Sequence, residues 1–543
     1  MTDPVADLHA AVEQAAAAVT AGPLKARPTL ERPKQAGHGD YSTNVAMLLA
    51  PAAGAPPREV AGKVGEELRA LLGDRVADVE VAGPGFLNLR LADGWYSGAL
   101  GHVLDAGDRF GEGDQHAGET AQVEFVSANP TGPLTAASGR HAAYGDAVAR
   151  LLAAAGYGVS REYYFNDAGS QILNLGLSIQ ARARGEEPPE DGYQGDYVHE
   201  LAEQIPGSAE AAPEDLAARG IELMIERIKA TLHDYRVDFD GWFSEQVLHP
   251  EGIEQGIERV AEHTYRHDGA LWLRTTSFGD DKDRVVVRQT GEPTYFGADI
   301  AYTLNKLERG YALLVNVLGS DHHGYVARLK AIVAAMGEDP GRYDVRILQF
   351  VHLVEGGERS GMSKRRGEFV TLDELISEIG VDATRWFMLQ RSHDSTIDLD
   401  LDLARQESAE NPVYYVQYAH ARIASVLAKA GEERVGAALT ATGDGAEGLE
   451  PAERALVKKL LAFPGEVREA AERRAPHRIA SYALELAQDF TAFYRDCRVV
   501  GAEPEALESF RLALSVATKR TIARSLDLLG VSAPESMSRA LGD

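Results

Sequence analysis

VEFVSANPTGPLTAASGRHAAYGD, the stretch at residues 123–146, decides the fold of this chain. VEFVSA has the composition of a short strand, and Pro130 and Pro133 end it. A helix is predicted over residues 140–155, and SREYYFN at 160–166 has the pattern of another strand. A strand, a loop, a helix and a second strand make a βαβ unit. Such a unit implies a parallel sheet that binds ligands at the carboxyl ends of its strands.

The loop and helix start in this stretch also predict an anion site. A helix N-terminus presents N–H groups without partners inside the helix, together with the positive end of the helix dipole. Both features favour a bound phosphate. A strand, a turn and a helix occur in many proteins, however, and the pattern taken alone is equally compatible with ordinary packing. The longer sequence SANPTGP…GRHAAYGD is a more specific signal than the strand, turn and helix alone.

The composition describes a multidomain protein without a disulfide. The chain has 543 residues, and 55 basic against 83 acidic residues leave a net charge of −28. That charge argues against binding to nucleic acid through the overall field and leaves local basic patches for such a role. The single cysteine, Cys497, predicts a reducing compartment, and we expect a cytoplasmic protein. No run approaches about 18 apolar residues and the acidic N-terminus is unlike a signal peptide, so no membrane association is expected.

Hydrophobic periodicity divides the chain into three predicted domains. Residues 1–112 combine helical spacing with two short strands around a Gly-Pro-Gly turn, which predicts a small α+β domain. Residues 113–400 alternate strand and helix patterns and are predicted to form an α/β domain with a helical insertion at about 184–290. Residues 401–543 show only helical periodicity, interrupted by an Ala/Gly/Thr-rich loop at 436–448, and predict an all-α bundle.

Four segments together resemble one known family. They are SANPTGP…GRHAAYGD, PTYFGADIAY at 293–302, GSDHHG at 319–324 and SGMSKRRG at 360–367. In this order they resemble the arginyl-tRNA synthetases, which are class I aminoacyl-tRNA synthetases, and the resemblance extends over residues 31–537. It implies a Rossmann-like catalytic domain, an N-terminal domain that contacts tRNA and a helical-bundle anticodon-binding domain.

The resemblance also implies an activity and a set of ligands. An arginine–tRNA ligase activates L-arginine with ATP to arginyl-adenylate and then transfers it to the 3′-terminal ribose of tRNA(Arg), releasing AMP and pyrophosphate. ATP, Mg²⁺ carried by the ATP, L-arginine and tRNA(Arg) are therefore the expected ligands, and a monomer is the expected form. The pair His322-His323 has no third ligand at a clear spacing, so no metal held by the protein itself is expected.

The first ATP signature of the family is altered in this chain. The His-x-Gly-His positions hold Thr135-Ala136-Ala137-Ser138, and both histidines are absent. Loss of one preorganised donor typically costs roughly 2.7–4 kcal/mol of transition-state stabilisation. A hydroxyl group with an ordered water can replace an imidazole donor, whereas His141 is three residues too late to replace Ser138 in register. The resemblance assigns ATP contacts here to four residues: Pro130, Thr135, Ser138 and Gly139.

The second ATP signature is recognisable at residues 360–367. The first lysine of the Lys-Met-Ser-Lys loop is replaced by Gly361. Lys364 matches the second lysine and is expected to neutralise charge on the leaving pyrophosphate, with Arg365 beside it. The resemblance adds further ATP contacts at Met362 and Ser363, and at Gly319 and Asp321, where the adenosine and its ribose would lie.

An arginine side chain requires anionic partners, because a guanidinium is a fixed fork of five donors. The resemblance assigns arginine contacts to five residues: Glu124, Asn129, Tyr295, Asp299 and His323. The four-residue spacing of Tyr295 and Asp299 predicts that they share one face of a helix. The alternative for Asp299 taken alone is a local cap or ion pair.

Contacts with tRNA are expected at both ends of the chain. KQAGHGDYSTNVA at 34–46 resembles the N-terminal domain of the family and contains Asn44. NPVYYVQYAHAR at 411–422 places Tyr415, Tyr418 and Arg422 on one helix, where aromatic rings can stack on anticodon bases. The alternative is that most of these tyrosines pack between helices. REAAERRAPHR at 468–478 and KRTIAR at 519–524 are the basic stretches that could contact phosphates.

Two other functions remain compatible with the sequence. One is a non-catalytic tRNA-binding relative, because the first signature is altered. The other is a paralogue that adenylates arginine for a different acceptor, although the anticodon domain argues against it. A dinucleotide-binding enzyme is disfavoured, because no Gly-x-Gly-x-x-Gly follows a strand.

Overall fold

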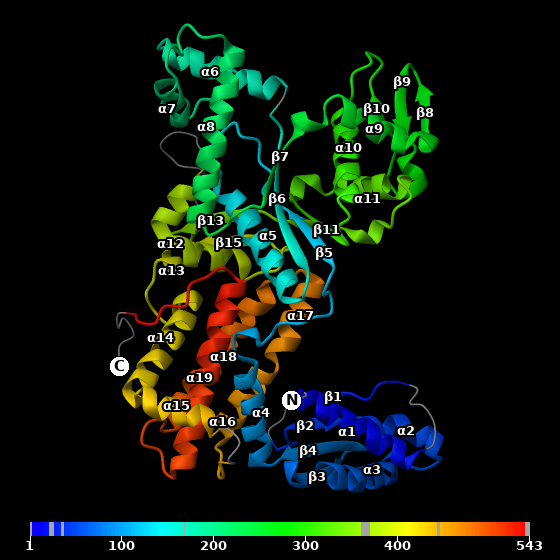
Figure 1. Ribbon diagram of the computed structural model, residues 1–543, viewed down its shortest axis with the longest axis vertical. Helices are drawn as coiled ribbons and strands as arrows, with labels where there is room; N and C mark the ends of the chain where they lie inside the picture. Colours follow the sequence, from blue (N-terminus) through cyan, green and yellow to red (C-terminus); the bar gives the residue numbers. More distant parts are fainter. Residues whose placement is uncertain are drawn as a thin grey trace.

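The computed structural model describes residues 3–20, 26–33, 37–167, 169–359, 370–441 and 446–537. Figure 1 shows an elongated molecule with a parallel sheet at its middle, a helical bundle below it and a separate N-terminal unit beside the end of the bundle. None of the helices in the described ranges is both long and apolar enough to cross a membrane. Met362, Ser363, Lys364 and Arg365 lie outside the described residues.

The N-terminal unit packs helices on an antiparallel sheet of order β1-β2-β4-β3. The helices are α1 (Pro4–Val19), α2 (Val45–Ala53) and α3 (Pro57–Leu72), and the strands are β1 (Leu30–Glu31), β2 (Tyr41–Thr43), β3 (Val76–Ala82) and β4 (Phe86–Leu91). The predicted Gly-Pro-Gly turn joins β3 to β4, which confirms the pair of strands. The next helix, α4 (Asp93–Ala106), packs instead against the C-terminal bundle, where Asp93 pairs with Arg454 at 2.7 Å.

The central sheet is parallel throughout and has the order β12-β11-β5-β6-β7. Its strands are β5 (Thr120–Glu124), β6 (Gly158–Phe165), β7 (Gly241–Ser244), β11 (Leu313–Gly319) and β12 (Tyr343–Leu348). α5 (Ala136–Ala154) connects β5 to β6, which confirms the βαβ unit. The helix begins four residues before the predicted position because the Thr135 side chain caps it.

The predicted helical insertion at 184–290 is helical only in its first half. α6 (Ser170–Ala183), α7 (Asp196–Gln204) and α8 (Pro213–Asp234) form a helical unit with its own core, and β7 then returns to the central sheet. After α9 (Glu251–Arg259) the chain forms an antiparallel sheet of β8 (Thr264–His267), β9 (Ala270–Leu273) and β10 (Arg284–Val287), so the helical prediction is wrong there. Asp268 and Gly269, both at positive φ, make the two-residue turn between β8 and β9.

Two helices and a small sheet complete the α/β region. α10 (Tyr295–Glu308) and α11 (Tyr325–Ala335) precede and follow β11. β13 (Val351–Glu355), β14 (Glu358–Arg359) and β15 (Ile397–Asp400) form a three-stranded sheet, and α12 (Leu372–Leu389) lies between the last two in sequence. α12 packs along α5, so the helix that follows residues 360–369 lies beside the helix that follows the altered signature.

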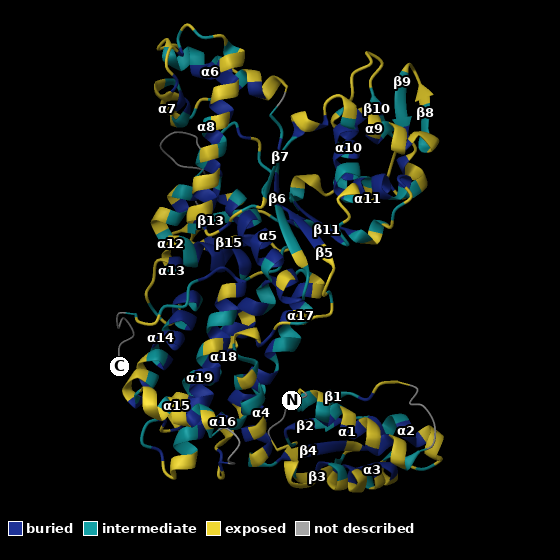
Figure 2. Cartoon of the chain, viewed as in Figure 1, coloured by how far each residue is buried: buried dark blue, intermediate teal, exposed yellow. Residues whose placement is uncertain are grey.

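The described residues beyond 401 form helices only, as predicted. They are α13 (Leu401–Ala404), α14 (Pro412–Ala430), α15 (Glu432–Thr440), α16 (Pro451–Leu461), α17 (Phe463–Arg473), α18 (His477–Asp496) and α19 (Glu505–Leu528). The loop predicted at 436–448 is helical up to residue 440. Figure 2 shows the buried residues concentrated along α5, α14, α18 and α19, which belong to one continuous apolar core.

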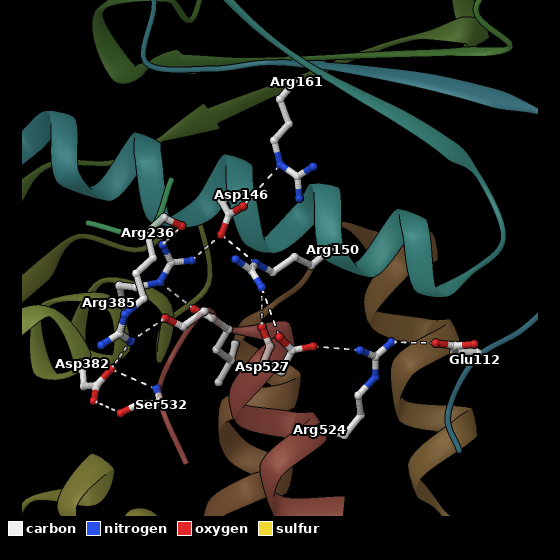
Figure 3. Close-up of polar contacts among 12 residues, drawn as sticks. Glu112, Asp146, Arg150, Arg161, Arg236, Asp382, Arg385, Arg524, Asp527 and Ser532 are labelled. Atoms are coloured by element: carbon white, nitrogen blue, oxygen red, sulfur yellow. Dashed lines mark hydrogen bonds and ion pairs between the residues drawn. The ribbon is translucent and has the colours of Figure 1, made fainter. Parts of the chain in front are cut away.

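A buried ionic junction joins the bundle to the helices of the α/β region (Figure 3). Asp146 on α5 is 2% exposed and bonds Arg385 of α12 at 2.6 Å, Arg150 at 2.8 Å and Arg161 at 3.3 Å. The fully buried Arg385 also donates to the carbonyl of Leu529, at the end of α19, at 2.8 Å. One arginine therefore connects two helices of the α/β region, α5 and α12, with the end of α19.

Arg385 has a second anchor at the end of α8, where its Nη1 donates to the Tyr235 carbonyl at 3.0 Å. Gly530, at φ +67°, leaves the space that the guanidinium fills, since a Cβ there would lie 2.2 Å from Arg385 Nη2. Gly310 has a similar φ of +76° but open space around the Cβ position.

We therefore expect Gly530→Ala to destabilise the protein far more than Gly310→Ala. Both substitutions carry the backbone strain of a left-handed residue, about 1 kcal/mol. Only Gly530→Ala also displaces the buried guanidinium from Asp146, and breaking a buried ion pair costs about 3–5 kcal/mol. Chemical denaturation of the two variants and the parent measures the difference. Equal losses would show that Arg385 can move without cost.

Candidate active site

A cavity of about 370 Å³ opens at the carboxyl end of the central sheet. β5, β6 and β11 supply its floor, α10 and α11 cover it, and α5 borders it. Its lining includes five of the polar side chains discussed below and several tyrosines: Glu124, Ser127, His141, Asp299, Asn316, Tyr164, Tyr302, Tyr325 and Tyr343. The position agrees with the ligand site that the βαβ unit predicts.

The chain turns sharply where β5 enters the cavity. Val126 and Ser127 have φ values of 66° and 43°, which are unusual for residues with a side chain. Ser127 Oγ donates to Glu124 at 3.2 Å and accepts from the Tyr164 N–H at 3.2 Å, and these bonds hold the turn. Strained backbone of this kind persists where surrounding structure enforces it, typically at functional sites.

Three polar side chains lie in one row across the sheet under α10. Glu162 of β6 is in register with Glu124 of β5, which is in register with Asn316 of β11. All three are at most 6% exposed. The row lies on the face that α10 covers, so the polar groups of α10 are its natural partners.

α10 supplies the cations that this buried row requires. Lys306 pairs with Glu124, and Arg309, directly after the helix, donates to Glu162 at 2.9 Å. Tyr302 also donates to Glu162, at 2.6 Å. Burial disfavours the charge on Lys306, but Glu124, Tyr343 and Glu162 together outweigh burial and raise the pKa of Lys306. Both carboxylates are therefore compensated within the protein.

Asp299 is the exception among the acids of this site. Its Oδ2 atom is buried and has no hydrogen-bond partner in the described part of the chain. Burial raises the pKa of Asp299 to about 7; Arg328 opposes the increase, whereas Glu245 and Glu124 add to it. A carboxylate oxygen is thus held in the cavity wall with its acceptor capacity unused, which is a costly arrangement for the empty protein.

A second group of polar residues borders the other side of the cavity. Gly319 ends β11, and Asp321 and His322 follow it in the lining. His141 of α5 lies beside them, because a Cβ on Gly319 would be 3.8 Å from His141 Cε1. Burial, reinforced by Arg140, lowers the pKa of His141 to about 4, so its imidazole is neutral at neutral pH.

Thr135 and Ser138 lie at the start of α5 and do not line the cavity. Thr135 Oγ1 accepts from the Ser138 N–H at 3.3 Å and lies 3.2 Å from Ser138 Oγ, so the two hydroxyl groups cap the helix and contact each other. The Ala136 N–H donates to the Val370 carbonyl at 2.9 Å, and the Leu372 N–H donates to Leu134 at 2.8 Å. The start of α5 is therefore joined to the residues that directly follow 360–369.

Several predicted site residues lie outside the cavity lining. Tyr295 is the first residue of α10 and is 69% exposed, although it is one turn from Asp299. Asn129 donates to Gln171 at 2.9 Å and faces α6. His323 is exposed next to the lining residue His322, while Pro130 and Gly139 are buried near the start of α5.

The sequence predicted only a minority of the cavity lining: Glu124, Asp299, Gly319 and Asp321. His141 was excluded as a replacement for Ser138 and does lie in another register, but it reaches the cavity from the next turn of α5. Tyr302 and Lys306 follow Asp299 by three and seven residues, and this helical spacing was a usable signal. Asn316 was also visible, as a polar residue inside the apolar run ALLVNVLG.

The predicted tRNA residues have partners within the protein. Asn44 accepts from the Thr29 N–H at 3.0 Å, and Tyr415 donates to Thr491 at 3.0 Å. Arg422 donates to the Tyr418 hydroxyl at 2.8 Å and lies over the Tyr418 ring at 4.7 Å. The same guanidinium is 5.5 Å from the ring of Tyr494, which is 40% exposed.

Most cations of the two basic stretches are neutralised by carboxylates. Arg473, Arg474, Arg478, Lys519 and Arg524 all form ion pairs. Within the described ranges, Arg468 and Arg520 form no ion pair. These two arginines are therefore the cations of the basic stretches that are available to a phosphate.

The comparisons with known proteins agree across the three regions. Residues 6–91 match the model of the arginyl tRNA synthetase N-terminal domain, residues 252–424 that of the class I (R) catalytic domain, and residues 416–537 that of the DALR anticodon-binding domain. The chain is 46% identical over 528 residues to the arginine–tRNA ligase of Shouchella clausii (strain KSM-K16), covering 94% of each.

Two solved structures are also similar. The arginyl-tRNA synthetase of Thermus thermophilus is 26% identical with a TM-score of 0.76, over 99% of this chain and 100% of that one. A Campylobacter jejuni protein described as a candidate arginyl-tRNA synthetase is 33% identical with a TM-score of 0.76, over 82% of this chain and 100% of that one.

The raised pKa of Asp299 predicts a cost in stability that depends on pH. Its ordinary value is 3.8 and its folded value is about 7, so the folded protein loses stability as pH rises from about 4 to 7 and the full cost is present at pH 8. We expect Asp299→Asn to increase the free energy of unfolding by on the order of a few kcal/mol at pH 8 and by less at pH 5. The thermal midpoint should rise accordingly. Calorimetry at both pH values tests this.

The matched control is Asp321→Asn, at a carboxylate that is 74% exposed in the same cavity's rim. It should change the midpoint little at either pH. A gain that is the same for Asp299→Asn at pH 5 and pH 8 would contradict the assignment of the cost to a buried charge.

Proposed function

Since the chain belongs to the arginyl-tRNA synthetase family and its reaction is the ligation of arginine to tRNA, we propose that the cavity under α10 binds the arginine. The observation that carries this proposal is the unpaired Oδ2 of Asp299 in the cavity wall. A guanidinium brings five donors and a positive charge. It would satisfy the orphan oxygen and favour the ionised form of Asp299.

Glu124 has a different part in this proposal. Lys306 and Ser127 already bond its two oxygens, so Glu124 adds negative potential and further acceptor capacity to the floor. Tyr295 and Asn129 lie outside the cavity lining, and we propose that they contact arginine only after a local rearrangement around the bound substrates. We propose that His323 also contacts arginine after such a rearrangement.

We propose that ATP occupies the side of the cavity formed by Gly319, Asp321 and His141. Gly319 allows close approach of the adenosine, and Asp321 can accept from a ribose hydroxyl. Thr135, Ser138 and the start of α5 offer donors toward the phosphates, and Pro130 and Gly139 shape this end. Mg²⁺ would arrive with ATP, bound mainly through phosphate oxygens.

The second signature completes the proposed ATP site. Lys364 precedes Val370 by six residues, and Val370 accepts from the start of α5. This connection supports a role for Lys364 and Arg365 at the triphosphate, with Met362 and Ser363 beside them. Positive charge there would stabilise the pyrophosphate as it leaves.

The chemistry that these residues serve has two steps. A carboxylate oxygen of arginine attacks the α-phosphorus of ATP, the bond to the β-phosphate oxygen breaks, and pyrophosphate leaves arginyl-adenylate. The terminal ribose hydroxyl of tRNA then attacks the arginyl carbonyl, loses its proton and releases AMP. Orientation and charge neutralisation account for both steps without a covalent enzyme intermediate.

For tRNA we propose contacts along the bundle and the N-terminal unit. Tyr418, Arg422 and the exposed Tyr494 form an aromatic and cationic cluster suited to stacking with a base. Tyr415 borders this helix, Asn44 lies in the N-terminal unit, and Arg468 and Arg520 are available to phosphates. We propose a cytoplasmic monomer, since one chain carries all of these parts.

ATP–pyrophosphate exchange tests the function directly. The assay is run with purified protein in the presence and absence of arginine and of matching tRNA. Exchange that depends on both arginine and tRNA would establish a working ligase in which Thr135 and Ser138 replace the histidines. Tight tRNA binding without exchange would instead support the non-catalytic relative, and adenylation of arginine without transfer to tRNA would support the paralogue.

The pH dependence of arginine binding provides a sharper test of Asp299. Because its pKa in the empty protein is about 7, the ionised fraction rises from about one tenth at pH 6 to about nine tenths at pH 8. The apparent KM for arginine should therefore fall about tenfold over this range, while the KM for ATP serves as the internal control. In Asp299→Asn the arginine KM should be high and lose this pH dependence. A flat profile in the parent would remove Asp299 from the arginine site.

Lys364→Ala should slow adenylate formation with little effect on arginine binding. Loss of a group that acts on the leaving pyrophosphate typically costs a factor of about 10²–10³ in rate. Lys330→Ala, at an exposed lysine on α11, is the control and should retain the parent rate. A proportional increase in the arginine KM would contradict a role confined to the transition state.

A further inference from the structure

Asn316 carries a second orphan acceptor in the same cavity. Its side chain is 6% exposed, lines the cavity, and has a buried Oδ1 without a hydrogen-bond partner among the described residues. Among the described residues that line the cavity, Asp299 Oδ2 is the one other buried oxygen without a partner. Two unsatisfied acceptors on residues that line one cavity point to a ligand group that carries several donors.

The Asn316 amide is oriented with its nitrogen toward Tyr343. Its Nδ2 donates to the Tyr343 hydroxyl at 3.3 Å, and Lys306 Nζ donates to the same oxygen at 3.3 Å. An ammonium group has no acceptor capacity, so the Tyr343 oxygen must accept from it. In this arrangement the amide nitrogen faces the Tyr343 oxygen, and Oδ1 is the amide atom without a partner among the described residues.

The register of the sheet places this oxygen next to the charged row. Asn316 is the partner of Glu124 on the neighbouring parallel strand, so both side chains project from the same face toward α10. Asp299 projects from α10 into the same cavity. Sheet and helix therefore contribute one orphan acceptor each.

We propose that Asn316 is a further arginine-binding residue, whose Oδ1 accepts an N–H of the guanidinium that Asp299 also binds. This inference rests on the proposed function of the cavity. The guanidinium has enough donors for both oxygens and for Glu124. Asn316 adds an acceptor without adding a third negative charge to a wall that already contains Glu124 and Asp299.

An acceptor at this position also contributes to specificity. The ureido group of citrulline has the shape of a guanidinium but presents an oxygen in place of one nitrogen. In one orientation that oxygen would face Asn316 Oδ1, and in the other it would face Asp299, so an acceptor meets an acceptor in either case. Buried polar groups left unpaired are a strong basis for rejection.

The test compares Asn316→Leu with Asn305→Leu in ATP–pyrophosphate exchange. Asn305, on α10, has the same kind of buried, unpaired Oδ1 but does not line the cavity, so it is a matched control. For Asn316→Leu we expect the arginine KM to rise by roughly 5- to 100-fold, with kcat and the ATP KM within about twofold of the parent. Weaker exclusion of citrulline as a competitor should accompany this change. Asn305→Leu should leave all of these values unchanged.

Asn316→Ser provides a second, smaller replacement whose hydroxyl is too short to substitute for the amide, and the same increase in KM is expected. An unchanged arginine KM in either folded variant would overturn the inference and show that the Asn316 oxygen is satisfied by solvent. Asp299→Ala distinguishes a failure of the Asn316 assignment from a failure of the cavity assignment. If it raises the arginine KM and the Asn316 variants do not, only the role of Asn316 fails. If neither change affects arginine, the assignment of the cavity itself fails.

Discussion

The buried contact between Asp146 and Arg385 is the interaction on which the arrangement of this molecule depends. Both side chains are at most 2% exposed, and charges so far from water are tolerated only when they are fully paired. Arg385 meets that requirement by bonding to α5, to the end of α8 and to the end of α19 at once. The sheet's crossover helix, the helical insertion and the bundle therefore share one fixed point (Figure 3).

This fixed point has a direct consequence for the active site. α5 starts at the altered signature, α12 starts just after residues 360–369, and their first residues exchange backbone hydrogen bonds. Asp146 and Arg385 clamp the same two helices at a second place. Two helices held at two places have little freedom to slide, so the segments that the ATP site would use are positioned from within the core. The bundle helix α19 is part of the same clamp.

The cavity lining, in contrast to the Asp146–Arg385 contact, contains buried polar groups that are not all paired. Under α10, Glu162 and Glu124 are compensated by Arg309 and Lys306. Asp299 and Asn316, which line the cavity, each keep one buried oxygen without a partner in the described part of the chain. The folded protein without ligand is less stable for this reason. Binding sites commonly carry such a cost, because groups that are preorganised for a ligand cannot also be satisfied by the protein.

Much of the fold could be predicted from the sequence because its signals are local. The periodicity of the C-terminal helices, the turn between β3 and β4 and the β5–α5–β6 unit are all properties of contiguous residues, and the structure confirms them. The hairpin at Asp268-Gly269 carried a local signal as well, but its strands of four residues were too short to stand out from the helical pattern around them.

The sequence by itself determined the strand, turn and helix that build the ligand edge of the sheet, and its resemblance to the family singled out Asp299 and Glu124, which both line the cavity. Only the tertiary structure decided which of these acids remains available. Glu124 meets Lys306 across a separation of 182 residues, while Asp299, in the lining of the same cavity as Asn316, keeps an oxygen without a partner among the described residues. The pairing of buried charges depends on which side chains the sheet register and the covering helix bring within hydrogen-bond distance. That proximity is a property of tertiary packing, and it cannot be predicted from the local sequence.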